Sequence, residues 1–249
     1  MRRWRERLCR LADVIVTPAP GILPPETPLD RVSVLEWGAD TDRFRPGLTG
    51  SPPYVRPAAA TVVVFAGAFR TWHGAIHLVR AITDLQTRGY DVGAVLIGDG
   101  PESGRVRDEA SGARHILFTG ALAHDLMPAA LAAADVGVAP FDLAAHPPLA
   151  LGFYWSPLKI FEYMAAGLPV VAPAVDRIPM LLRHDREAVL YDATHARGLA
   201  DALARLTDAP LRARLGAAAR DRAVRDYSWA AHCRALEAAF VNARGRRSS

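Results

Sequence analysis

A lysine and a glutamate three residues apart lie at the start of a helix-forming run, where they could hold a phosphorylated ligand. The run from 156 to 172 reads SPLKIFEYMAAGLPVVA, and Lys159 is the only lysine of the chain. The amino end of a helix and a nearby lysine bind anions, and Glu162, one turn further on, could accept hydrogen bonds from ribose hydroxyls. The pattern would suit a nucleoside-diphosphate site. An ordinary α/β unit with a surface lysine explains the local pattern equally well.

The same run encodes a helix that ends at a tight turn and passes into a strand. Pro157 suits the first helical turn, where its missing N–H costs no hydrogen bond. Gly167 suits the left-handed position after a helix, and Pro169 prevents the helix from continuing. Residues 170–172 form a short apolar run, which is typical of a strand covered on both faces.

Three predicted strands end in glycine-containing turns, at Gly67, at Gly98 and Gly100, and at Gly120. Glycine at the carboxyl end of a strand lets a ligand approach the backbone closely. Together with the helix that begins at Ser156, these turns could surround one elongated ligand. The spacing lacks the G-x-G-x-x-G fingerprint, so a nicotinamide cofactor is unsupported.

No motif for nucleophilic, metal or P-loop chemistry accompanies these turns. The sequence has no serine-nucleophile elbow, no Walker loop and no zincin-type histidine pair. His73 and His77 are four residues apart and could share a helix face, but no third metal ligand is evident. We therefore expect no metal ion and no bound cofactor.

Composition indicates a globular protein with a basic bias. The 249 residues carry a formal charge of +4 at pH 7, with 51% hydrophobic and 22% charged residues. Much of the positive excess is arginine near the two ends, at 2–10 and 244–247. Such ends could attract nucleic acid or an anionic membrane, but no nucleic-acid motif accompanies them, so solvated ends are favoured.

Neither a membrane anchor nor a disulfide framework is expected. No apolar stretch reaches the roughly 18 residues that a membrane span needs. Charges between residues 5 and 13 interrupt any secretory signal. Cys9 and Cys233 lie far apart, without metal or disulfide spacing. We expect a cytoplasmic protein, whose basic ends could contact the inner face of the membrane.

Strand and helix patterns alternate along most of the chain. Expected strands are 14–16, 32–35, 62–65, 92–97, 115–118, 136–139 and 170–172. Expected helices are 2–11, 74–88, 101–110, 123–133, 156–166, 195–206, 210–225 and 228–243, the last capped by Ser228. This alternation predicts the α/β class with a doubly wound parallel sheet, whose ligands bind beyond the carboxyl ends of the strands.

These motifs, in this order, resemble the nucleotide-sugar-binding C-terminal half of GT-B glycosyltransferases, specifically the retaining family 4 (group 1) class. The segments that carry the resemblance are 34–44, 65–74, 96–101, 118–120, 162–171 and 227–229. It extends from about residue 10 to residue 243. On this basis residues 1–50 are the remnant of an N-terminal acceptor domain with a linker, and 51–249 are a Rossmann-like nucleotide-sugar-binding domain with C-terminal helices.

The resemblance implies transfer of a sugar, such as a hexosyl group, from a nucleotide-diphosphate sugar with retention and without a metal. Arg70, Lys159 and Glu162 are the catalytic residues that it implies, with Glu162 on the ribose and Lys159 near the diphosphate. The donor-binding residues that it implies are Gly67, His73, Gly98, Gly100, Thr119, Gly120, Leu122, Ser156, Pro157 and Leu158. Basic side chains and the helix dipole would neutralise the leaving diphosphate.

Three positions depart from the family pattern. Ala68 stands where the family commonly has arginine, and His73 stands where it commonly has lysine. Tyr154 replaces an acidic residue that contacts the sugar in many members. Arg70, or a protonated His73, could take over a phosphate contact.

The resemblance also implies a separate N-terminal acceptor domain, of which residues 1–46 match only the last helix, strand and exit loop. We expect a partner chain or self-association to supply the rest, since apolar surface around 11–35 would otherwise be exposed. Three functions compete: a transferase or transferase half, a non-catalytic nucleotide-sugar-binding module, and a structural relic. An epimerase or phosphorylase on the same plan is a further alternative, although no phosphorylase-type lysine signature is present.

Overall fold

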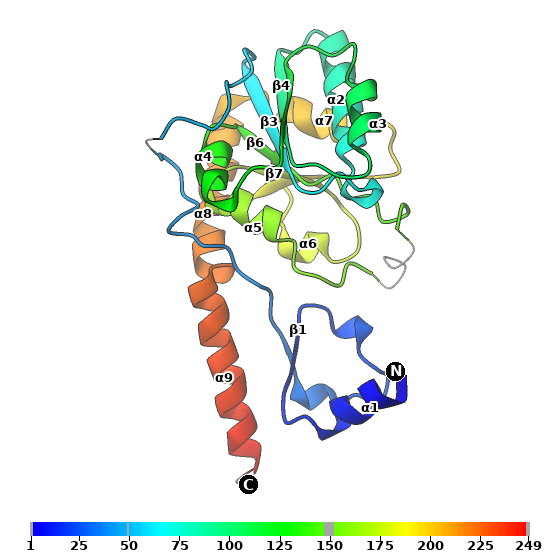
Figure 1. The fold of residues 1–249 in the computed structure, drawn as a ribbon. Coiled ribbons are helices and arrows are strands. Elements are labelled where there is room, and N and C mark those ends of the chain that lie inside the picture. The colour runs from blue at the N-terminus through cyan, green and yellow to red at the C-terminus, as the bar shows by residue number, and fades with distance from the viewer. Residues whose placement is uncertain (1, 49, 147–151, 248–249) are drawn as a thin grey trace.

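A computed structural model describes residues 2–48, 50–146 and 152–247. Its centre is a six-stranded sheet in the order β5-β4-β3-β6-β7-β8, with every neighbouring pair parallel (Figure 1). The strands are β3 (Thr61–Ala66), β4 (Val92–Ile97), β5 (Ile116–Gly120), β6 (Val136–Val138), β7 (Val170–Pro173) and β8 (Ala188–Tyr191). The chain order reverses direction between β3 and β6, so this is the switch point at which doubly wound sheets bind ligands.

Helices cover both faces of this sheet, which explains its continuous apolar strands. All six residues of β3 and all six of β4 are buried. On one face lie α2 (Ala75–Thr87), α3 (Ser103–Glu109) and α7 (Gly198–Arg205). On the other lie α4 (Met127–Ala132), α5 (Leu158–Ala165) and part of α8 (Ala209–Asp226). The predicted α/β class and doubly wound parallel sheet are confirmed.

A small N-terminal unit lies apart from the six-stranded sheet. It consists of α1 (Arg2–Leu11) and the parallel pair β1 (Ile15–Thr17) and β2 (Val32–Val34). Figure 1 shows this unit at one end of the molecule, beside the last helix, α9 (Trp229–Arg247). Several of its large apolar side chains are exposed, namely Trp4, Leu8, Leu11, Val16, Leu29 and Val34. The expected apolar surface around 11–35 is therefore present.

One arginine of α8 ties α5 to residues 35–46, the segment after β2 that is called the interdomain segment below. The Arg220 guanidinium donates to the carbonyls of Thr41, Phe44 and Ala165 at 2.8–2.9 Å. Two of these acceptors belong to the interdomain segment, and the third lies at the carboxyl end of α5. Arg220 thereby fixes the far end of the helix whose amino end carries Lys159.

Close contact between α5 and α8 depends on a glycine. A Cβ at Gly216 would lie 2.2 Å from the carbonyl oxygen of Gly167. Gly167 has a φ of +79°, which confirms the predicted left-handed turn after α5. The two helices can approach this closely because position 216 has no side chain.

Two elements were not expected, and the helices α3, α4, α5 and α7 begin two to four residues later than the sequence predicts. The strand β8 and the short helix α6 (Ile178–Leu181) were not expected, because each spans four residues and lacks a clear period. Pro157 is the N-cap of α5, with a ψ of 76°, and does not lie in its first turn. The expected cap of the last helix is confirmed, since Ser228 Oγ accepts from the Ala231 amide at 3.1 Å.

Within the described ranges, no helix is both long enough and apolar enough to cross a membrane.

Substituting Gly216 by alanine should destabilise the domain by about 1–3 kcal/mol, because the new methyl group meets a carbonyl that cannot move freely. Gly104 in α3 has nothing within 4 Å of its Cβ position, so Gly104→Ala is the matched control. The control should be neutral or stabilise by up to about 1 kcal/mol. Chemical denaturation measures both, and equal stabilities would contradict the close approach of α5 and α8.

Candidate functional site

The turns after β3, β4 and β5 lie side by side at the carboxyl edge of the sheet. The Gly67 amide donates to Ile97 O at 2.9 Å, and the Gly98 amide donates to Gly120 O at 2.8 Å. A Cβ at Gly98 would lie 2.0 Å from Gly67 O, so only glycine permits this approach. Three of the predicted glycines are therefore neighbours in space.

Further predicted donor-binding residues, Gly100, Thr119 and Leu122, lie on or next to the same turns. A Cβ at Gly100 would lie 2.7 Å from Phe69 O, so the turns after β3 and β4 also pack tightly here. Thr119 Oγ1 donates to Gly120 O at 2.8 Å. Leu122 is partly buried and packs against the core on the α5 side of the sheet. The carboxyl edge of β3–β5 is thus a continuous, glycine-rich surface.

The second turn of α5 is anchored to the end of β3. Tyr163 is fully buried, and its hydroxyl oxygen accepts from the Ala66 amide at 2.7 Å. Its ring passes Gly137, where a Cβ would lie 2.5 Å from the ring carbon Cγ. This contact holds α5 against the end of β3, directly before the Gly67 turn.

Two of the predicted donor-binding groups at this helix end have partners of their own. The Leu158 amide donates to Ser156 O at 3.0 Å. Ser156 is buried, and its hydroxyl donates to Glu36 Oε2 at 2.7 Å while accepting from the Trp37 amide at 2.9 Å. The Ser156 hydroxyl therefore faces the interdomain segment.

Lys159 is a buried cation without a hydrogen-bond partner in the described structure. Its Nζ is inaccessible and lies 4.5 Å from the ring centroid of Phe65 and 5.4 Å from that of Phe141. A Cβ at Gly67 would lie 2.6 Å from this Nζ, so the glycine makes room for the ammonium group. Burial lowers the pKa of Lys159 to about 7, against a smaller opposing effect of Glu162. An anion at this point would supply the missing partner.

Glu162 lies one turn beyond Lys159 on α5. Burial raises the pKa of its carboxyl group to about 7, and the charge of Lys159 opposes this rise. Both groups therefore change protonation near neutral pH, and their titrations are coupled. A carboxylate held this way can accept hydrogen bonds from neutral hydroxyl groups when it is ionised.

Arg70 and His73 were predicted to take over a phosphate contact where the family commonly has other basic residues. Neither side chain is a buried cation like Lys159. Burial and the nearby Lys159 lower the pKa of His73 to about 4, so its imidazole is neutral at pH 7. Its Nδ1 lies 2.7 Å from Ala68 O and donates to it. Arg70 is exposed and lies over the ring of Trp72, 5.3 Å from the centroid. His73 thus brings no positive charge to the candidate site, and the Arg70 side chain is exposed to solvent.

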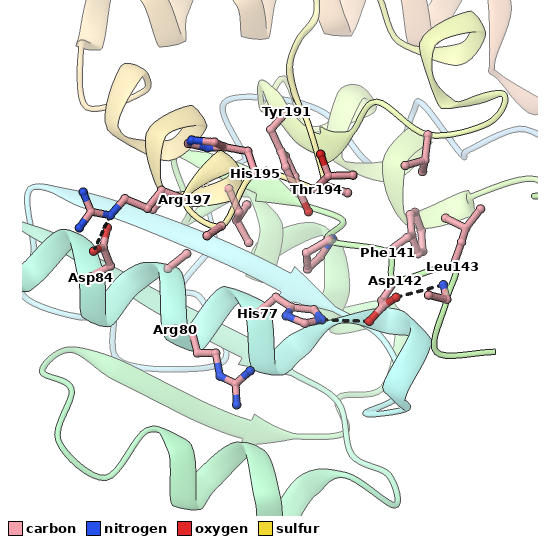
Figure 2. A pocket seen from close by; sticks show the side chains of 18 residues that line it. His77, Arg80, Asp84, Phe141, Asp142, Leu143, Tyr191, Thr194, His195 and Arg197 are labelled. Carbon is pink, nitrogen blue, oxygen red and sulfur yellow. Dashed lines mark hydrogen bonds and ion pairs between the residues drawn. The ribbon is translucent and has the colours of Figure 1, made fainter.

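A cavity of about 690 Å³ opens between α2, α7 and the loop that follows β6. Figure 2 shows His77 paired with Asp142 and Arg197 paired with Asp84 along its wall. Lys159 and Glu162 do not line it. Phe141 lines the cavity, and its ring also contacts the Lys159 ammonium. This ring is therefore shared by the cavity and the surroundings of Lys159.

The pair His73 and His77 does not form a metal site. His77 Nε2 lies 3.2 Å from Asp142 Oδ2, whereas His73 contacts a backbone carbonyl. Within the described ranges, no three His, Cys, Asp or Glu side chains are grouped so that they could hold a metal ion. The expectation that no metal is needed stays a prediction.

Sequence reasoning found the charged residues of the site and missed the groups that enclose them. It found Lys159, Glu162 and the glycine turns, which the fold brings together. It missed the aromatic rings of Phe65 and Phe141 around the ammonium group. The strand pattern already placed Phe65 beside Gly67, but no sequence signal marks Phe141 as its partner.

Comparisons with known proteins agree on one family. The family model described as glycosyl transferases group 1 matches residues 60–209. A GDP-mannose-dependent alpha-(1-6)-phosphatidylinositol monomannoside mannosyltransferase of Mycobacterium tuberculosis is 29% identical over 211 residues, which are 81% of this chain and 54% of the relative. The chain therefore spans about half the length of this relative.

Solved structures with low sequence identity share the fold. Sucrose-phosphate synthase from Thermosynechococcus elongatus aligns with a TM-score of 0.72 at 21% identity, over 98% of this chain and 61% of that one. Anabaena Alr3699/HepE in complex with UDP and glucose aligns with a TM-score of 0.74 at 18% identity, over 97% of this chain and 66% of that one. Both alignments include nearly all of this chain and leave more than a third of the neighbour unmatched.

The single lysine allows a direct test of the site electrostatics. Protein labelled only at lysine should give one side-chain NMR signal, which titrates near pH 7, well below the roughly 10.4 of a free lysine. Glu162→Gln should lower this midpoint further, because the carboxylate favours the protonated ammonium. A midpoint near 10 in the parent protein would show that Lys159 is solvated.

Proposed function

The chain belongs to the group 1 family of glycosyl transferases, and on that premise we propose that it binds a nucleoside-diphosphate sugar at the carboxyl edge of β3–β5. The observation that carries this proposal is the Lys159 ammonium beside Gly67, which has no hydrogen-bond partner among the described residues. A diphosphate next to Gly67 would meet this cation and the positive end of the α5 dipole. Glu162, one turn on, would accept hydrogen bonds from the ribose hydroxyls, as the family resemblance implies.

The same geometry and the neighbours support a nucleotide-sugar donor. Anabaena HepE was solved with UDP-glucose, and the mycobacterial relative is named as GDP-mannose-dependent. We therefore propose a nucleotide-diphosphate sugar as donor and leave the base open between uracil and guanine. The base would lie against the turns of Gly98, Gly100, Thr119 and Leu122.

We propose that transfer proceeds with retention. The bond between the anomeric carbon and the diphosphate oxygen breaks, and a bond from the same carbon to an acceptor oxygen forms. The acceptor proton passes to the departing phosphate oxygen, which gains negative charge. Lys159 and the amino end of α5 would stabilise that charge, and one such donor in a closed site typically contributes about 3–4 kcal/mol.

Full activity requires an acceptor-binding part, because the chain spans about half the length of the relative described above. We propose that this part docks on the N-terminal unit, whose exposed apolar side chains lie on α1, β1 and β2. It could be a separate chain, a second copy, or further residues of the same polypeptide. A cytoplasmic location, with the basic ends near the inner membrane face, belongs to the same proposal. Without an acceptor part, the domain would act as a nucleotide-sugar-binding module.

Calorimetric titration with UDP and GDP tests the proposal. Glu162→Ala should weaken the preferred nucleotide by about 10- to 100-fold, because a hydrogen bond to a charged group is worth about 1.5–3 kcal/mol. Thermal unfolding of the variant should match that of the parent. If neither nucleotide binds at millimolar concentration, the domain is a relic of the family; if binding persists without transfer in the complete protein, it is a binding module.

The pH dependence of binding tests whether Lys159 contacts the diphosphate. Its pKa of about 7 in the free protein means that it loses its proton above pH 7, so diphosphate affinity should fall as pH rises from 7 to 9. Lys159→Met should weaken the nucleoside diphosphate more than the nucleoside and should abolish this alkaline decline. Ligand ionisation is the same for both proteins, so parallel pH profiles would rule out a phosphate role for Lys159.

A further inference from the structure

A buried ion pair contacts the residues that lead into the amino end of α5. Glu36, in the interdomain segment after β2, pairs through Oε1 with Arg177, which directly precedes α6. The side chains are 13% and 7% exposed, so the pair is shielded from water. The Arg177 guanidinium also donates to Trp155 O at 3.2 Å. The pair thus reaches the two residues that lead into Pro157, the N-cap of α5.

The other oxygen of Glu36 makes the connection to α5 itself. Glu36 Oε2 accepts from the Ser156 hydroxyl at 2.7 Å, and the Ser156 oxygen accepts from the Trp37 amide at 2.9 Å. A serine hydroxyl has one hydrogen to donate, and Glu36 takes it. Ser156 therefore has no hydrogen left for a phosphate oxygen while this contact exists.

The interdomain segment that presents Glu36 is fixed from the opposite side. The carbonyl oxygen of Glu36 lies 2.7 Å from His232 Nδ1 of α9. Ala39 pairs with Ser228, and its amide donates to Tyr227 O at 2.7 Å. A Cβ at Gly38 would lie 2.5 Å from the Ser228 backbone, so the segment is pressed against the junction of α8 and α9. Glu36 is consequently held at a defined distance from α5.

We propose that Glu36 is a positioning residue that, through Ser156 and Arg177, fixes the amino end of α5 and thereby the diphosphate-binding site. Only Pro157 and Leu158 separate Ser156 from Lys159, so a shift of Ser156 displaces the backbone amides and the ammonium group together. The segment that joins the N-terminal unit to the sheet domain then takes part in donor binding without touching the donor. This inference rests on the proposed donor site.

Glu36→Gln is the first test, because it keeps the shape of the side chain and leaves Arg177 without a counter-charge. We expect the dissociation constant for the preferred nucleoside diphosphate to rise about tenfold, while that for the nucleoside changes less than twofold. Glu109→Gln is the matched control, since it makes the same chemical change in the exposed Arg80–Glu109 pair. It should leave both constants unchanged.

Ser156→Ala separates positioning from direct phosphate contact. If Ser156 acts with Glu36, the double variant Glu36→Gln/Ser156→Ala should lose no more affinity than the weaker-binding single variant. If Ser156 instead contacts phosphate itself, the two losses should multiply, and the proposal fails. An unchanged diphosphate affinity in Glu36→Gln, or equal losses for diphosphate and nucleoside, also overturns it.

A second measurement needs neither a ligand nor Glu36→Gln. Ser156→Ala changes no charge, so it should move the single lysine NMR signal only if Ser156 fixes the position of Lys159. If the parent protein binds no nucleotide, the proposed function fails, and this signal alone decides the positioning role. An unmoved signal in Ser156→Ala then overturns the inference.

Discussion

One ammonium group held out of water dominates the electrostatics at the amino end of α5. Lys159 has aromatic rings and a glycine around its Nζ and no hydrogen-bond partner in the described structure. An unpaired buried cation is costly, and the lowered pKa of this lysine expresses that cost. An anionic ligand would remove this cost, so the proposed site would convert an unfavourable burial into affinity for negative charge. The charge of Glu162 opposes this shift, and the pKa of Glu162 is itself raised by burial.

The surrounding scaffold holds this lysine in place at three points along α5. Tyr163 joins the helix to the end of β3, and Arg220 ties its carboxyl end to the interdomain segment. Glu36 reaches its amino end through Ser156. Each contact involves a group buried away from water, where a lost hydrogen bond costs more than at the surface. The helix therefore has little freedom to move independently of the sheet and the interdomain segment.

Two family-typical positive charges are replaced in this chain, at Ala68 and His73. His73 is neutral at pH 7, and Arg70 lies at the rim against Trp72. In the proposed donor site, the positive charge facing a diphosphate would therefore come from Lys159 and the helix dipole. With fewer fixed charges the position of α5 would matter more, and with it the contact between Glu36 and Ser156.

The sequence by itself determined the alternation of strands and helices, the glycine turns, and the lysine and glutamate of the site. These follow from local causes: apolar periodicity, left-handed glycine at Gly167, and the spacing of charges along one helix. It did not reveal β8 or α6, because four residues carry too little periodicity to distinguish a strand from a helix.

Only the tertiary structure decided what surrounds the charges. Phe141 lies 18 residues before Lys159, and Glu36 lies 120 residues before Ser156. No local pattern encodes such contacts, because they depend on the order of strands in the sheet and on the path of the interdomain segment. The same holds for the burial of Lys159. The sequence showed a lysine at the start of a helix, but only the fold buries its Nζ and leaves it without a hydrogen-bond partner among the described residues.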